Sequence, residues 1–128
     1  SIELHNYLLA GFYLEGISEE IKRICQIATQ LSCTENQKKE MIETIQKLQG
    51  YYLDTIKSFH SKDTEIALQL SDKKAELNGL MDNLLLKNKK IDDYNSMISR
   101  MRRLISFNHN IGRLTYQDCH YFSDLSKP

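Results

Sequence analysis

A heptad pattern that runs from Ile42 to Ile105 is the strongest constraint on how this chain folds. Alternating steps of three and four residues reach an apolar side chain at all but four positions, which are Gln49, Asp63, Lys73 and Lys87. This spacing places the apolar side chains along one stripe of an α-helix. A single helix over this span would be roughly 95 Å long at 1.5 Å per residue, and it needs a partner helix to bury its stripe.

The remainder of the composition also favours helices over strands. The only proline is the last residue, Pro128, and the glycines are solitary. No sustained alternation of apolar and polar residues indicates a strand. The 17 basic and 17 acidic side chains cancel, so net charge gives no overall attraction to nucleic acid or to an anionic membrane. We therefore expect an all-α protein.

The N-terminal residues 1–31 carry the same rhythm, from Tyr7 to Leu31, and are expected to form an amphipathic helix. The polar stretch that follows has the residues of a capping box, with Thr34 as N-cap and Gln37 at the third helical position. We therefore expect a turn at 32–35. The heptad phase continues unbroken across this stretch, so one continuous helix is the alternative.

The favoured architecture is a long coiled-coil helix over about 36–107, with the N-terminal helix packing back on it. The apolar face widens around residues 41–53 through Met41, Leu48 and Leu53, which is typical of a helix covered on a second side. Asn110 to Gly112 has the character of a helix terminator, so 108–128 is expected to be an aromatic tail, either a short helix or irregular. An intramolecular hairpin, turning within 59–65 with Asp63 as N-cap, is the alternative.

The polar seam residues favour an antiparallel homodimer. A parallel pair would place each charge opposite its own copy, whereas an antiparallel register sets Asp63 against Lys73 and Gln49 against Lys87. The predicted interface consists of Ile42, Ile45, Tyr52, Ile56, Phe59, Asp63, Ile66, Leu70, Lys73, Leu77, Leu80, Leu84 and Ile91.

The C-terminal part is mildly basic, because residues 94–128 hold five basic and two acidic side chains. Such a cluster could be a solvated helix face, or it could contact an acidic protein, nucleic acid or a membrane surface. The candidate partner-binding residues are Arg100, Arg102, Arg103, Arg113, Tyr116, Tyr121 and Phe122.

No motif of catalysis or metal binding is present in the sequence. Cys25, Cys33 and Cys119 form no ligand pair, and His109, Cys119 and His120 match no metal-ligand spacing. No phosphate-binding loop, nucleophile elbow or HExxH is found. We therefore expect a protein that is not an enzyme and that has no cofactor or metal site.

The pattern predicts a non-catalytic coiled-coil module for oligomerisation, acting as a scaffold or adaptor in assemblies with itself and with another protein. One alternative is a compact helical bundle that acts as a regulator or chaperone and binds a partner helix along Met41, Leu48 and Tyr52. The other is weak nucleic-acid binding through the basic cluster. No stretch is apolar enough to span a bilayer, and the odd number of cysteines suits a reducing compartment. The expected location is intracellular, either cytoplasmic or nuclear.

Overall fold

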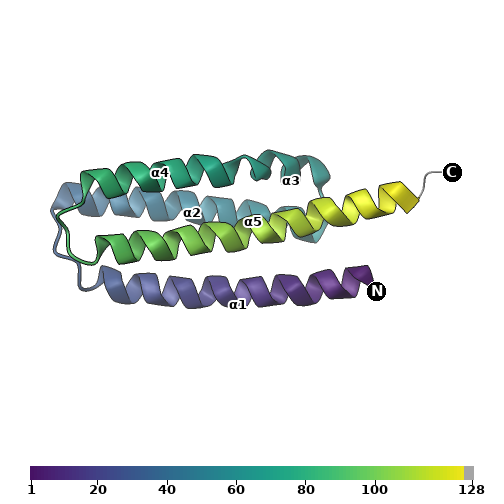
Figure 1. Cartoon of the computed structure of the whole chain (residues 1–128), viewed down its shortest axis with the longest axis horizontal. Coiled ribbons are helices and arrows are strands. Elements are labelled where there is room, and N and C mark those ends of the chain that lie inside the picture. The colour runs from purple at the N-terminus through teal and green to yellow at the C-terminus, as the bar shows by residue number, and fades with distance from the viewer. Residues whose placement is uncertain (126–128) are drawn as a thin grey trace.

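The computed structural model describes the backbone of residues 1–125 and the side chains of residues 1–115, and it forms an all-α bundle (Figure 1). Its helices are α1 (Ile2–Ala28), α2 (Glu35–Ser61), α3 (Thr64–Ser71), α4 (Lys73–Lys87) and α5 (Tyr94–Leu125). The chain makes four alternating passes along the bundle, because α3 and α4 follow one another along the same direction (Figure 1). The all-α class that the sequence predicts is confirmed.

The turn between α1 and α2 is built as the sequence predicts. The Gln37 backbone N–H donates to Thr34 Oγ1 at 3.2 Å, and the Thr34 N–H donates to Gln37 Oε1 at 2.8 Å. This capping box satisfies two donors at the start of α2. The Gln37 amide also donates to Asn88 Oδ1, which ties the start of α2 to the loop that precedes α5.

The prediction of one long helix over 36–107 is wrong. The first break lies at Lys62, whose φ of 56° is left-handed, and at Asp63, whose carboxylate accepts from the Ile66 N–H at 3.1 Å and caps α3. The second interruption is at Asp72, and the third is the loop 88–93, where Asp93 has a φ of 64°. The turn of the hairpin alternative, with Asp63 as N-cap, is confirmed, but that alternative implies a three-helix bundle and does not contain the further reversal at 88–93.

Helix α5 lies at the centre of the packing and contacts α1, α2, α3 and α4. Its side chains Met97, Ile98, Met101, Ile105 and Ile111 are fully buried in the core. Helix α1 folds back, as expected, but it packs on α5 rather than on α2. The approach is so close that a Cβ at Gly16 would lie 2.8 Å from the Phe107 ring, so glycine is needed there. Helix α5 also continues through Asn110 and Gly112, so the predicted terminator does not end it.

We predict that Asp63→Ala lowers the free energy of unfolding by about 1 kcal/mol, because the first turn of α3 loses its cap. Asp63→Ser should retain most of the stability, and the exposed Asp54→Ala is the control. Chemical denaturation measures all three. If Lys73→Asp restores the stability lost in Asp63→Lys, Asp63 pairs with Lys73 across a dimer instead of capping α3.

Candidate functional site

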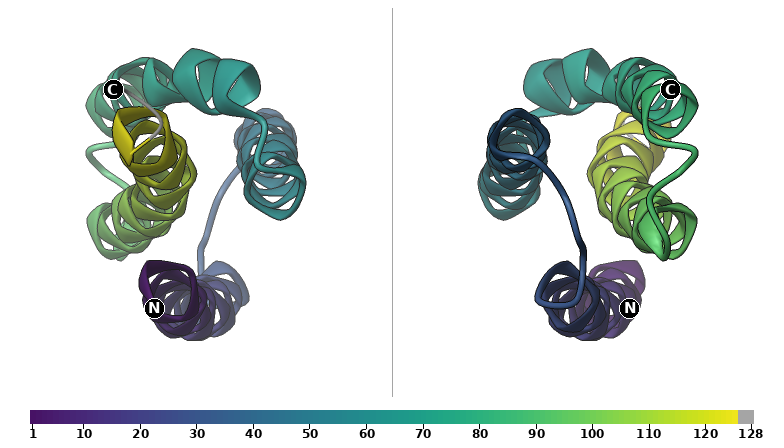
Figure 2. Two further views of the ribbon diagram at one scale, coloured as in Figure 1. Left: turned by 90° about the vertical axis from the view of Figure 1, so that its right-hand side faces the viewer. Right: turned by 90° about the vertical axis from the view of Figure 1, so that its left-hand side faces the viewer.

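A groove of about 410 Å³ lies between α1 and α2, with α5 as its floor. Seen end-on, α1 and α2 stand apart and are joined by the loop 29–34, while α5 lies between α1 and α4 (Figure 2). The groove is lined almost entirely by apolar side chains, with Gln49 as the exception. The other lining residues are Ile17, Ile21, Ile24, Cys25, Ile45, Leu48, Tyr52, Met101 and Leu104.

Each wall of the groove is the edge of a stripe that continues into the core. On α1, Ile17 and Ile24 are buried, whereas Ile21 projects to one side of them and is 47% exposed. On α2, Leu48 is buried, and its neighbour Ile45 is 41% exposed. The apolar surface of both helices is therefore wider than α5 alone can cover.

Two further apolar side chains of α2 do not line the groove but neighbour its lining on the helix surface, since Ile42 precedes Ile45 by three residues and Leu53 follows Gln49 by four. Ile42 and Leu53 are both more than half exposed, at 56% and 57%. Contiguous exposed apolar surface on a folded protein commonly marks an interaction site or a ligand groove. With Ile21 and Ile45, these residues form what we call the groove rim.

The groove is bounded at both ends. At one end the Tyr7 and Phe59 rings meet edge to face at 5.5 Å, and Lys62 Nζ lies 2.8 Å from Glu3 Oε1. At the other end the loop 29–34 joins the two helices. From Ile17 to Cys25 the groove wall on α1 rises about 12 Å at 1.5 Å per residue. The lined length thus matches about two helical turns of a partner laid along it.

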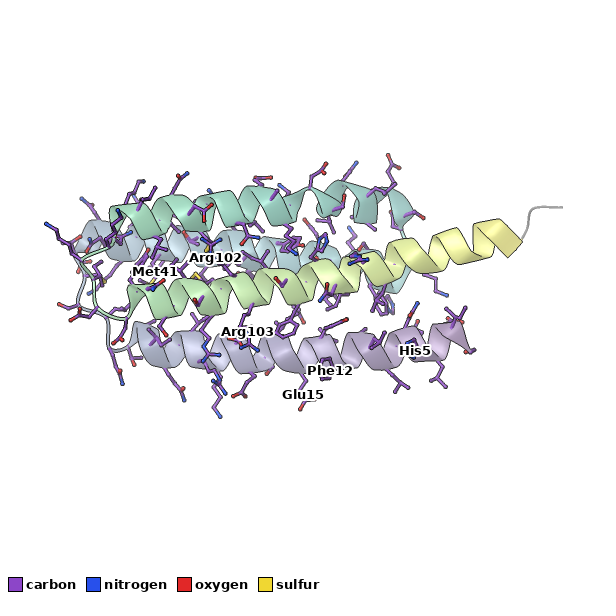
Figure 3. All side chains as sticks on the ribbon, viewed as in Figure 1. His5, Phe12, Glu15, Met41, Arg102 and Arg103 are labelled. Carbon is purple, nitrogen blue, oxygen red and sulfur yellow. The ribbon has the colours of Figure 1, made fainter. Side chains whose placement is uncertain are left out.

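The basic cluster is engaged by carboxylates of the same chain. Glu20 on α1 is buried, and its Oε1 lies 3.1 Å from Arg103 Nε and 3.4 Å from Arg100 Nη1. Arg102 lies on another side of α5, where it pairs with Asp82 and donates to Asn78 Oδ1 at 3.1 Å on α4. Arg103 and Arg102 accordingly point toward α1 and α4 (Figure 3). These ion pairs neutralise charges that a phosphate contact would need.

The other partner-binding candidates do not join that cluster. Arg113 is exposed further along α5, beside a different cavity. The side chains of Tyr116, Tyr121 and Phe122 lie outside the part of the chain whose side chains are described.

Most residues of the predicted dimer seam pack against other helices of the same chain. Leu70, Leu77 and Leu84 are buried in the core, so they are not free to face a second copy, and this part of the predicted interface is wrong. Lys73 pairs within its own helix with Glu76, and Lys87 pairs with Glu40 on α2. The seam residues that pack partly buried against the core are Tyr52, Ile56, Phe59, Ile66, Leu80 and Ile91. Ile42 and Ile45 alone of the apolar seam residues are exposed.

The sequence predicts that a folded-back helix covers the wide face at Met41, Leu48 and Leu53, whereas Leu48 lines the groove and Leu53 is exposed. The sequence pattern does not single out Ile21 and Cys25 as the facing wall. The signal for Ile21 is present in the sequence, because Ile17, Ile21 and Ile24 together make a stripe wider than a single seam.

No group of three or more His, Cys, Asp or Glu side chains gathers in a metal-binding arrangement among residues 1–115. Nor is any helix within the described chain long and apolar enough to cross a membrane. No protein family, curated protein or solved structure matches this chain. The geometry of the groove is therefore the basis for a functional conclusion.

We predict that Glu20→Gln lowers the free energy of unfolding by about 2 kcal/mol, because Arg100 and Arg103 lose their shared carboxylate between α1 and α5. Glu19→Gln is the matched control, since its pair with Arg23 is exposed and should be worth less than about 0.5 kcal/mol. Urea unfolding measures the difference. Equal effects of the two changes would show that the buried pair does not hold α1 in place.

Proposed function

We propose that this protein is a non-catalytic interaction module that binds an amphipathic helix of a partner protein in the groove between α1 and α2. The observation that carries the proposal is the groove rim, four exposed branched apolar side chains above a floor of Met101 and Leu104. A helix with apolar residues at i, i+3 or i+4, and i+7 buries such a surface on insertion.

The shape of the groove favours a helix over other occupants. Its two walls are helices that run in opposite directions, and its floor is a third helix, α5 (Figures 1 and 2). A docked helix would pack on all three by ridges into grooves, as helices do within a bundle. The backbone groups of a helix are satisfied internally, so it can enter an apolar groove that offers Gln49 as its one polar amide.

Placing a photo-reactive benzoylphenylalanine at Ile45 in the native cell should cross-link the partner, and mass spectrometry identifies the linked segment. A synthetic peptide of that segment should gain helical circular dichroism on binding. Its affinity, measured by fluorescence anisotropy, should fall at least about tenfold for Ile45→Glu, because a charge would enter the apolar contact.

Leu86→Glu is the matched control for that experiment, since Leu86 is an exposed leucine of α4 away from the groove. It should leave the affinity unchanged. Equal binding to the Ile45→Glu and wild-type proteins would contradict the proposal. So would cross-links from residue 45 that reach only a second copy of this chain.

Self-association is a second candidate function, and a separate patch favours it. Leu4, Leu8 and Phe12 follow one another at intervals of four residues on α1, and all three are about 60% exposed or more. This patch lies outside the groove lining. Helix faces of this kind pair readily with their own symmetry copy.

If the patch on α1 mediates self-association, Phe12→Lys should shift the protein toward the monomer in sedimentation equilibrium, with helical content unchanged. Glu43→Lys, a charge change at an exposed position of α2, should leave the association constant nearly as it is. A wild-type protein that remains monomeric at all accessible concentrations would eliminate this candidate.

A further inference from the structure

A second cavity of about 220 Å³ lies between α2, α3 and α5, and it shares no lining residue with the groove. Small side chains create it. Thr55 of α2, Ala67 of α3 and Gly112 of α5 line it, and a Cβ at Gly112 would meet nothing within 4 Å. The space is smaller than the site of a drug-sized ligand but large enough for a small metabolite or several waters.

The cavity wall holds a buried acceptor without a partner. Asn108 is 0% exposed; its Nδ2 donates to the Leu104 carbonyl at 3.0 Å, while its Oδ1 has no hydrogen-bond partner among the described residues. Leaving such an atom unpaired costs about 1–3 kcal/mol. By contrast, the neighbouring hydroxyl of Thr55 is satisfied by the Tyr51 carbonyl at 2.8 Å. Asn108 Oδ1 therefore needs a hydrogen-bond donor, and none of the described residues supplies one.

The surroundings of the cavity are electropositive. Arg113 lines it from α5 and is exposed, and no described carboxylate forms an ion pair with it. His109 is the adjacent lining residue, and burial, Lys74 and Arg113 together lower its pKa. Arg113 and Lys74 are the two cations here, and both would favour an anionic group at this position.

We infer that this cavity binds a small organic carboxylate that also carries a hydroxyl or amino group. The carboxylate would pair with Arg113 at the exposed side, and the hydroxyl or amino group would donate to Asn108 Oδ1. Ala67 and Leu70 are buried and provide the apolar contact for the carbon skeleton. The inference does not depend on what occupies the groove.

Three probes that differ by one group each test this inference. They are 3-hydroxybutyrate, butyrate without the hydroxyl, and methyl 3-hydroxybutyrate without the charge. In NMR titrations, 3-hydroxybutyrate should give saturable shifts of the Asn108 side-chain amide and the His109 ring. Butyrate and the methyl ester should each bind several-fold more weakly. The His109 pKa should rise on binding, because an anion stabilises the imidazolium form.

Variants separate ligand binding from general effects on the fold. Gly112→Leu should abolish the saturable shifts by filling the cavity, and Gly50→Leu, at an exposed helical glycine with open space, should leave them unchanged. If Gly112→Leu fails to fold, Gly112→Ala replaces it and should weaken binding several-fold with no loss of thermal stability. Non-saturable shifts, or equal shifts for the three probes, would show that the cavity holds water only and would overturn the inference.

Discussion

Because α1, α2, α3 and α4 all pack against α5, the apolar surface of this one helix determines where the rest of the chain can lie. Met97, Met101 and Ile105 are fully buried between helices that arrive from different sides. Unbranched methionines suit such a position, since they adapt to an irregular space. The buried pairing of Glu20 with Arg100 and Arg103 adds a fixed electrostatic contact on the α1 side.

The packing of four helices around α5 also accounts for the groove between α1 and α2 and for the cavity between α2, α3 and α5. Helices α1 and α2 share α5 as a floor, and the ring contact of Tyr7 with Phe59 joins them at one end, so apolar side chains along their length remain uncovered. Between α2, α3 and α5 the small residues Thr55, Ala67 and Gly112 do not fill the space, and a cavity remains. The groove is apolar and suited to a helix, whereas the cavity combines the buried acceptor of Asn108 with positive charge.

Local signals were predictable from the sequence, and the choice between packing partners was not. The capping box depends only on Thr34 and Gln37, three residues apart, so the residue types at these two positions are sufficient to predict it. A heptad stripe has the same sequence pattern whether it packs on a second chain or on other helices of its own chain. Leu70, Leu77 and Leu84 pack in the core of their own chain. Asp63 fits both a seam charge and a helix cap in the sequence, and the structure shows the cap. Glu20 and Ile21 acquire their roles only when α1 is placed beside α5 and opposite α2.

Binding of a partner helix requires that the groove rim is solvent-accessible apolar surface in the free protein. Methyl NMR of isoleucine-labelled protein with a soluble gadolinium chelate measures this directly. We expect strong paramagnetic relaxation of the Ile21, Ile42 and Ile45 methyl groups, and weak relaxation of those of the buried Ile98 and Ile105. Protection of the rim methyl groups equal to that of Ile105 would contradict the account, because the groove would then already be covered.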